Sequence, residues 1–378
     1  MQRPLASYLV VDLTTELGWL CGKILGEFGC DVLKVEPPGG DPGRRSQPYA
    51  FAAWNLGKRS AVLDLRWAED RKELIELAKK ADFLIESFPP GYMHSIGLGW
   101  EQLHACNPRL VMTSITPYGQ KGPAAGAPAS DLEISASSGA VWLAGDPDRA
   151  PVRITLPQSA GWASIQAAMG TLLAHYARQR TGRGQHVDVS AQASLVPALV
   201  NGPYYWEILR QMPMRGGPYL TGRNVEGVPM RNVWPCKDGF VAFAIYGGVA
   251  GRQSNRALVQ WMAKENMAPV WLADLDWESF DVATVKADEI HRLEEAIAPF
   301  LKTLTKWQFL NGAMDRRILG YVVSTVEDIL GDPQLQSREV WREYEGVIHP
   351  TGYARFDGQQ AYPVIGVPVV DEIEATPT

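Results

Sequence analysis

The chain of 378 residues contains little cysteine, and its four cysteines are dispersed: Cys21, Cys30, Cys106 and Cys236. They form no CxxC pair, and no group of cysteine and histidine has the spacing of a metal site. We therefore expect reduced thiols, as in a cytoplasmic protein, with neither a disulfide framework nor a metal cofactor.

The motifs of several common enzyme classes are also missing. No GxGxxG follows the first predicted strand and no GxxxxGK[ST] occurs, which disfavours a nicotinamide cofactor and P-loop chemistry. No serine lies in a GxSxG elbow. Apolar runs are too short to cross a bilayer, and Asp12 and Glu16 interrupt the N-terminal run, so we expect neither a signal peptide nor a membrane partner.

The net charge of −6 and the pI near 5.6 disfavour nucleic acid as a partner. Hydrophobic residues make up 46% and charged residues 21%, which is typical of a globular protein with a large core. Two basic loops remain, GDPGRR (40–45) and NLGKRS (55–60), and Arg66 closes the following strand. Each loop alone is equally compatible with a solvated surface, but together they favour a ligand that carries a diphosphate.

Short apolar runs alternate with helical patterns along the first part of the chain. Strands are predicted at 7–13, 31–36, 60–66, 82–88 and 109–115, with helices at 16–28 and 69–80 between them. A long helix over 159–180 and a strand over 186–190 follow. This alternation predicts a doubly wound α/β sheet, whose ligands bind beyond the carboxyl ends of the strands.

The remaining chain divides by composition. We expect residues 1–210 to form one large α/β domain, and the glycine-rich residues 211–235 to form a linker or mobile loop. Residues 236–318 read as a compact small domain, and residues 319–378 return to mixed strand and turn signals.

Six motifs occur in an order that identifies a family: GKILGEFGCDVLKVEPPGGDPGRR, NLGKRSAVLDLR, ADFLIESFPPGYMHSIGLGWEQLHACNPRLV, TSITPYGQKGP, ASDLEISASSG and RQRTGRGQHVDVS. Together they resemble the class III CoA-transferase family (CaiB/BaiF type), which also contains α-methylacyl-CoA racemases. The resemblance is dense over residues 7–200 and thinner beyond. It implies a Rossmann-like, CoA-binding large domain built from both chain ends (residues 1–210 and 319–378), a small inserted domain (residues 236–318), and an interlocked-ring homodimer.

The resemblance also implies a catalytic residue. In transferases of this family the nucleophilic aspartate follows a Ser-Gly pair by about ten residues, which matches Asp148 after Ser138-Gly139. Asp148 would move CoA from an acyl-CoA donor to a carboxylic acid through an aspartyl anhydride and an aspartyl-CoA thioester. Both intermediates conserve the activation of the acyl group, so the reaction requires neither metal nor ATP. Asp131 is expected to be structural.

For coenzyme A, the co-substrate, the resemblance implies ten binding residues: Glu16, Leu17, Arg44, Leu63, Arg66, Ser87, Phe88, Ser95, Tyr118 and Lys121. Three positions depart from the family pattern: Ser87 replaces the usual asparagine, Ser95 the usual arginine, and Pro89 a frequent arginine. Each missing arginine removes a phosphate contact of about 1.5–3 kcal/mol. Arg44, Arg45 or Lys121 are candidates to compensate.

Two alternatives stay open. An acyl-CoA racemase or isomerase needs a histidine and an aspartate, but the matching positions hold Ser130 and Gln158-Ser159, which disfavours racemisation. The second alternative is a non-catalytic or partner subunit of a heteromeric CoA-transferase, because the family contains such chains and the expected CoA site is altered. The tryptophans of the C-terminal half further suggest an aromatic or apolar acceptor acid, if they line a site: Trp206, Trp234 and Trp261.

Overall fold

The computed structural model describes residues 3–199, 201–220, 228–282, 284–352, 354–360 and 366–369. The chain divides into two compact units, each made of separate chain segments. The first unit comprises Met1–Ala140, Ile154–Val200 and Leu330–Thr378, and the second comprises Val141–Arg153 and Asn201–Ile329. Part of the predicted linker, residues 221–227, lies outside the described residues.

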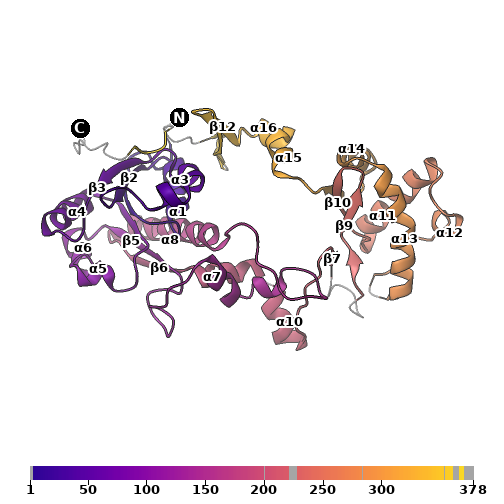
Figure 1. Cartoon of the computed structure of the whole chain (residues 1–378), viewed down its shortest axis with the longest axis horizontal. Helices are drawn as coiled ribbons and strands as arrows, with labels where there is room; N and C mark the ends of the chain where they lie inside the picture. Colours follow the sequence, from indigo (N-terminus) through magenta and orange to yellow (C-terminus); the bar gives the residue numbers. More distant parts are fainter. Residues whose placement is uncertain are drawn as a thin grey trace. The chain divides into compact units, whose positions relative to one another are not determined.

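The first unit is built on a six-stranded parallel sheet with the strand order β3-β2-β1-β4-β5-β6, which confirms the predicted α/β sheet (Figure 1). Most strand residues are buried because helices cover both faces, and such strands read as nearly continuous apolar runs. The order reverses between β1 and β4, which both leave the sheet at the same edge. The strands are β1 (Leu9–Leu13), β2 (Asp31–Glu36), β3 (Arg59–Val62), β4 (Phe83–Glu86), β5 (Val111–Thr116) and β6 (His186–Ser190).

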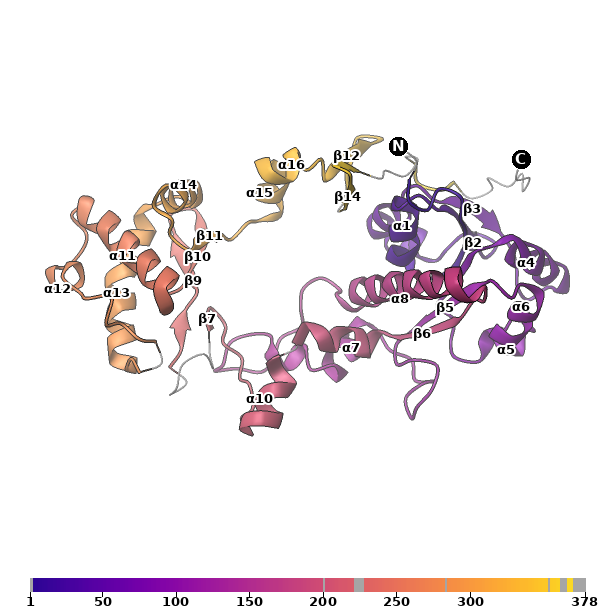
Figure 2. The same ribbon diagram turned by 180° about the vertical axis from the view of Figure 1, so that it is seen from behind.

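Two layers of helices enclose this sheet (Figures 1 and 2). One face packs against α1 (Trp19–Glu27) and α8 (Ser159–Thr181), and α3 (Pro48–Asn55) packs on α1. The other face packs against α4 (Ala68–Lys80), α5 (Tyr92–Ser95) and α6 (Trp100–Cys106). Each face has its own hydrophobic cluster, so the sheet is the boundary between two cores.

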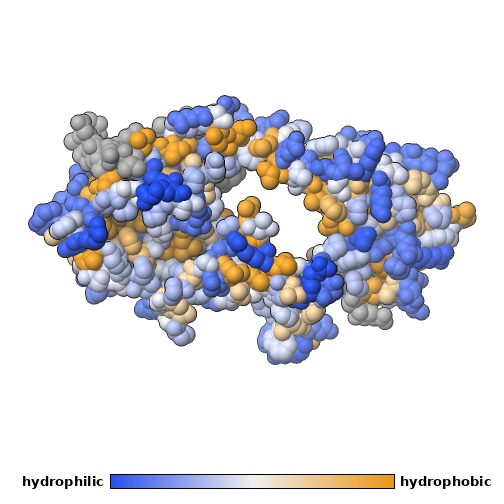
Figure 3. Space-filling view, viewed as in Figure 1, coloured by the Kyte–Doolittle hydropathy of each residue, from blue (hydrophilic) through white to orange (hydrophobic). Residues whose placement is uncertain are grey.

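The sequence of each helix matches the layer that it forms. Small residues of α8, such as Ala163 and Ala167, are fully buried, which allows close approach to the sheet. In α4, Leu74 and Ala78 face the core, whereas the remaining side chains are mostly charged. The exposed face of α4 is therefore hydrophilic, and it appears blue at the left of Figure 3.

The C-terminal part of the chain packs against the first unit. The Nζ atom of Lys23 donates a hydrogen bond to the carbonyl oxygen of Pro350 at 2.6 Å, and Gly57 N–H donates to Gly366 O at 2.6 Å. Short elements make up this region: α16 (Pro333–Ser337), β12 (Trp341–Tyr344), β13 (Val347–Pro350), β14 (Arg355–Phe356) and β15 (Gln359–Gln360). It follows α15 (Val326–Gly331).

The second unit is a three-stranded antiparallel sheet covered by helices, with strand order β11-β10-β9. Its core includes Trp234, Phe300 and Phe309. Its main elements are β9 (Val233–Cys236), β10 (Gly239–Phe243), β11 (Gly320–Val322), α11 (Gly248–Lys264), α13 (Ala287–Thr303) and α14 (Lys306–Arg316). The short elements are α10 (Asn201–Leu209), α12 (Val270–Ala273), β7 (Tyr219–Leu220) and β8 (Met230–Arg231).

The tryptophans of the second unit are mainly core residues. Trp234 is fully buried and its Nε1–H donates to the carbonyl oxygen of Phe243. Trp261 is 6% exposed and packs edge-to-face on Phe300. The suggestion that Trp234 and Trp261 line a substrate site is therefore wrong, because both are needed to fill this core. Only Trp206, which is half-exposed on α10, remains accessible of the three.

The turn between α8 and β6 depends on Gly184, because a Cβ atom there would lie 1.7 Å from the carbonyl oxygen of Leu110. We expect Gly184→Ala to lower the free energy of unfolding by about 1–3 kcal/mol, the usual cost of overpacking. Gly161 in α8 has no neighbour within 4 Å of its added Cβ, so Gly161→Ala is the matched control. Urea denaturation measures both, and equal stabilities of the two variants would contradict the prediction.

Candidate functional site

A pocket of about 420 Å³ lies in the first unit at the carboxyl ends of the strands. It forms where the loops after β1 and β4 diverge, which is the switch point at which doubly wound sheets bind their ligands. The loop after β5, residues 125–131 and the start of α8 complete its wall. A second pocket of about 300 Å³ lies beside it along the same edge, and the two share Thr15 and Phe88.

The structure brings six of the predicted CoA-binding residues to these two pockets. Four line the first pocket: Glu16, Leu17, Ser87 and Phe88. Leu63 and Arg66 line the second pocket, together with Phe88. These residues come from loops far apart in the sequence, and the parallel strands bring them to one edge because all their carboxyl ends point the same way.

The other four predicted residues line neither pocket: Arg44, Ser95, Tyr118 and Lys121. The guanidinium of Arg44 is bound to both carboxylate oxygens of Glu36 and to the carbonyl oxygen of Pro368, and it stacks on Phe51. Arg44 is thus a structural cation here. Ser95 Oγ donates to the carbonyl oxygen of Tyr92, whereas Tyr118 and Lys121 lie in the loop after β5.

Ser87 joins the two main loops of the first pocket. Its Oγ accepts a hydrogen bond from Thr15 N–H at 2.8 Å and lies 3.0 Å from Thr15 Oγ1. A short hydroxyl side chain at this position therefore links the loop after β1 to the loop after β4. Thr15 was not among the predicted site residues, and its position directly after the first strand was the only sequence signal for it.

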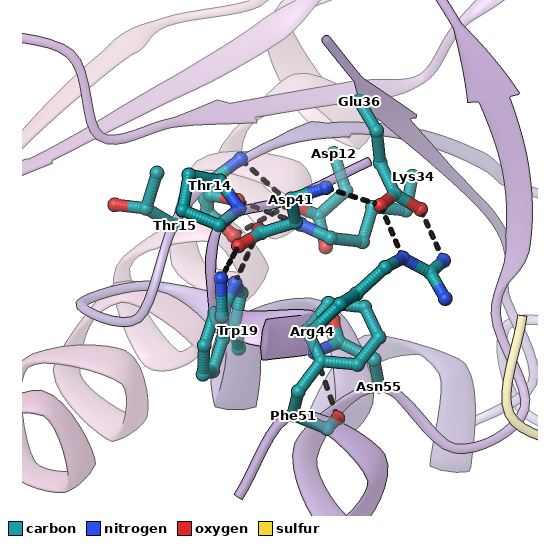
Figure 4. Close-up of polar contacts among 12 residues, drawn as sticks. Asp12, Thr14, Thr15, Trp19, Lys34, Glu36, Asp41, Arg44, Phe51 and Asn55 are labelled. Atoms are coloured by element: carbon teal, nitrogen blue, oxygen red, sulfur yellow. Dashed lines mark hydrogen bonds and ion pairs between the residues drawn. The ribbon is translucent and has the colours of Figure 1, made fainter. Parts of the chain in front are cut away.

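A buried network of charged side chains lies behind this edge (Figure 4). Lys58 Nζ binds Asp12 Oδ2 at 2.7 Å, and Lys34 Nζ lies 3.0 Å from Asp41 Oδ2. Lys34 also donates to the carbonyl oxygen of Thr14 at 2.7 Å, which fixes the turn that leads to Thr15. The expectation that the loop 55–60 binds phosphate is wrong for Lys58, because this lysine is 5% exposed and neutralises Asp12.

Burial and ion pairing oppose each other in this network. Burial disfavours the ionised form of Asp12, but Lys58 and Lys34 outweigh it and lower the pKa of the Asp12 carboxyl. Burial also lowers the pKa of Lys58 to about 8, although the adjacent Asp12 acts in the opposite direction. The ionised form of each of these side chains is therefore stabilised by its oppositely charged partner.

The acids near the strand ends share one local contact: their carboxylates accept backbone N–H groups of the loops at this edge. Asp12 accepts Thr14 N–H at 2.9 Å and Glu86 accepts Phe88 N–H at 2.7 Å. The same contact joins Glu36 to Asp41 N–H, Asp64 to Arg66 N–H, and Asp188 to Gln120 N–H. These carboxylates determine the course of the loops that form the pockets.

Asp131 has the structural role expected for it. It begins α7 (Asp131–Ser137), and its Oδ1 accepts hydrogen bonds from Gln158 N–H, Ser159 N–H and Ser159 Oγ at 2.8, 2.9 and 2.9 Å. The carboxylate thus caps the positive end of the 23-residue helix α8. The pocket lining contains only two acids, Glu16 and Asp131, and Glu16 accepts a hydrogen bond from Gln47.

Asp148 lies in the second unit, on the exposed loop 141–153. Both its carboxylate oxygens are bound to the guanidinium of Arg149, at 2.9 and 3.2 Å. Hydrogen bonding to Arg149 lowers the pKa of the Asp148 carboxyl, so the group is ionised at neutral pH.

Arg215 holds this loop in place. Its buried guanidinium donates to the carbonyl oxygens of Trp142, Asp146 and Arg149 at 3.1, 3.2 and 2.9 Å. Gly217 N–H donates to the carbonyl oxygen of Gly145 in the same loop. The start of the glycine-rich segment therefore fixes the backbone on both sides of Asp148.

The fold and the pocket define the class of protein. A parallel α/β sheet of order 3-2-1-4-5-6, with a pocket at its switch point, is the arrangement that binds nucleotide-type ligands. Within the described residues, no group of three or more metal-ligating side chains occurs, and no helix is long and apolar enough to span a membrane.

The profile of CoA-transferase family III matches residues 5–369, so the chain belongs to this family. It is a class III CoA-transferase, which transfers CoA between an acyl-CoA and a carboxylic acid. The prediction of the family from six short motifs is confirmed.

Two curated relatives and one crystal structure are similar over most of their length. The chain is 33% identical to the succinyl-CoA:(R)-benzylsuccinate CoA-transferase subunit BbsE of Thauera aromatica, covering 90% of this chain and 84% of that protein. It is 29% identical to the succinyl-CoA–D-citramalate CoA-transferase of Chloroflexus aurantiacus, covering 89% and 82%. A CaiB/BaiF family protein from Brucella suis is 26% identical, with a TM-score of 0.84, covering 98% and 97%.

The buried pair Asp12–Lys58 provides a test of the network behind the pocket. We expect Lys58→Met to lower the free energy of unfolding by about 3–5 kcal/mol, because it leaves a buried carboxylate unpaired. The double variant Asp12→Asn/Lys58→Met should lose clearly less free energy of unfolding than the sum of the losses in Asp12→Asn and Lys58→Met alone. Chemical denaturation of the four proteins measures this coupling, and additive losses would show that the pair is not coupled.

Proposed function

We propose that this chain binds a CoA thioester in the first-unit pocket and transfers its CoA to a dicarboxylic acid. The observation that carries the proposal is that Glu16, Leu17, Ser87 and Phe88, all expected to bind CoA, line one pocket at the switch point of the sheet. The named reactions of the two curated relatives support succinyl-CoA as the donor and a branched or substituted dicarboxylic acid as the acceptor.

In this proposal Asp148 is the nucleophile. Its carboxylate attacks the thioester carbonyl, forms an aspartyl anhydride and releases CoA as a thiolate. The thiolate then attacks the aspartyl carbonyl of the anhydride, which gives an aspartyl-CoA thioester and frees the donor acid. The acceptor carboxylate attacks the carbonyl of the aspartyl-CoA thioester, expels the CoA thiolate and forms a second mixed anhydride. The CoA thiolate then attacks the acceptor carbonyl of this anhydride, which gives the acceptor CoA thioester and regenerates the Asp148 carboxylate. The ionised state of Asp148 supports the first step, because only the carboxylate is nucleophilic.

A second candidate function is that of a partner subunit, whose catalytic carboxylate comes from a different chain. Two observations favour it. The relative at 33% identity is itself named as a subunit, and both acids of the first pocket are already engaged. An apolar groove between α1 and α8, lined by Ile24, Ile165 and Met169 among others, supports association with another chain, identical or related.

The location of the CoA site is tested by filling the pocket. Ala127 is exposed and lines the first pocket, whereas Ala124 belongs to the same loop and does not line it. We expect Ala127→Trp to weaken CoA binding at least about tenfold, or about 1.4 kcal/mol, and Ala124→Trp to leave it unchanged. Isothermal titration calorimetry with CoA measures the affinity of both variants, and unchanged affinity of the Ala127→Trp variant would reject this pocket as the CoA site.

The role of Asp148 is tested with Asp148→Asn, using Asp146→Asn in the same loop as the control. If Asp148 is the nucleophile, transfer falls by about 10³-fold or more in the first variant only, because an amide cannot form the anhydride. Incubation with succinyl-CoA and hydroxylamine should then yield a hydroxamate on the Asp148 peptide of the unaltered protein. Retained activity of Asp148→Asn would reject Asp148 as the nucleophile, whereas activity that appears only after a second chain is added favours the partner-subunit function.

A further inference from the structure

Glu86 is the last residue of β4 and is 3% exposed. Its Oε2 accepts the hydrogen bond from Phe88 N–H at 2.7 Å. Ser87 and Phe88 line the first pocket, and Phe88 also lines the second. One buried carboxyl group therefore fixes the turn through which the chain leaves the sheet and enters the wall of both pockets.

Glu86 differs in its charge balance from three of the other acids at this edge. Asp12, Glu36 and Asp64 each have a cation as partner: Lys58, Arg44 and Arg66. Glu86 makes no ion pair with any residue that the structure describes. Burial, with a smaller contribution from the nearby Asp188, raises the pKa of Glu86 to about 7, although hydrogen bonds from Ser114 and Phe88 act against it.

A row of polar side chains across the sheet provides partners for a protonated Glu86. Glu86 is paired in register with Ser114 of β5, which is paired with Asp188 of β6. Ser114 Oγ lies 2.9 Å from His186 Nε2, and burial lowers the pKa of His186, which favours its neutral ring. An ionised Glu86 accepts a hydrogen bond from Ser114, whereas a protonated Glu86 would donate to Ser114 Oγ and leave the Ser114 O–H to donate to His186, so that each donor would meet an acceptor.

We propose that Glu86, as a neutral carboxylic acid, positions the Ser87–Phe88 turn for CoA binding. The inference rests on the proposed function, since it takes the first pocket as the CoA site. A neutral acid accepts the Phe88 N–H without placing a negative charge behind a pocket that receives a polyanionic ligand. Glu86 is a positioning residue, because it acts through the backbone of Phe88.

Other titratable groups surround Glu86, and they are common to the wild type and its variants. From β1 the register neighbour is Leu13, and the side chain of Asp12 points to the opposite face because strand residues alternate. Within the described residues, the charged and titratable side chains on or near the same face include His186, Asp188, Glu101, His104, Lys121 and Tyr92, which packs on Phe88. A difference between wild type and a Glu86 variant therefore isolates Glu86.

The test compares Glu86→Gln, Glu86→Ala and the control Glu73→Gln, which alters an exposed acid of α4. CoA is titrated calorimetrically into each protein at about pH 6 and about pH 8. Glutamine accepts the Phe88 N–H and donates to Ser114, so Glu86→Gln should bind CoA within about twofold of wild type at the lower pH. Glu86→Ala should bind CoA about tenfold more weakly than wild type at both pH values, because the Phe88 N–H loses its acceptor and the turn is no longer held.

The pH dependence distinguishes positioning by a neutral acid from a merely structural role. Wild type and Glu73→Gln should lose affinity several-fold as the pH rises through about 7, because Glu86 ionises. Glu86→Gln should lack this loss. The inference is overturned if Glu86→Ala binds CoA as tightly as wild type, or if Glu86→Gln follows the wild-type pH dependence.

A second measurement separates this inference from the proposed function. The folded-state pKa of Glu86 is raised from 4.5 to about 7, so its contribution to stability is full below the lower value and is lost as the pH rises through the higher one. Glu86→Gln should therefore gain thermal stability relative to wild type between about pH 5 and pH 8. If the wild type does not bind CoA, the proposed function is rejected. If the stabilities of wild type and Glu86→Gln change in parallel with pH, the proposal that Glu86 is a neutral acid is rejected.

Discussion

The hydrogen bond from a loop N–H to a carboxylate at or near a strand end is the interaction on which the pocket edge depends. It recurs at Asp12, Glu36, Asp64, Glu86 and Asp188. Parallel strands all leave the sheet at one edge, and their loops must diverge there to open a pocket. A hydrogen bond from a loop N–H to one of these carboxylates gives the loop a defined direction, and a carboxylate is a strong acceptor for this purpose.

These carboxylates place negative charge beside the pocket in which a negatively charged ligand is proposed to bind. Basic side chains neutralise part of this charge: Lys58 and Lys34 lie beside Asp12, and Arg44 binds Glu36. Some of the basic side chains expected from the sequence to bind phosphate therefore form ion pairs that stabilise this edge of the sheet. Glu86 makes no ion pair with the part of the chain that the structure describes, and in the proposed arrangement a proton neutralises its carboxyl group instead.

Much of the fold followed from the sequence, because most strands of the sheet are buried and largely apolar runs between turn residues. The predicted strands at 31–36 and 186–190 match the structure to the residue, and the helix at 159–180 differs by one. The site was only partly predictable. Glu16, Leu17, Ser87 and Phe88 meet in one pocket, but nothing local to Arg44 indicates that Glu36 and Pro368 would occupy its guanidinium. Likewise, the burial of Trp234 and Trp261 depends on elements distant in the sequence.

The sequence by itself determined the family, the parallel sheet and the loops that form its ligand-binding edge, because periodicity and motif order are local properties of the chain. Tertiary structure alone decided which of those side chains remain available to a ligand. Asp131 caps α8 across 27 residues, Lys58 neutralises Asp12 across 46, and Arg215 holds the Asp148 loop from across 66 or more. Charge partners at such separations are chosen by packing and burial, and no local pattern in the sequence encodes them.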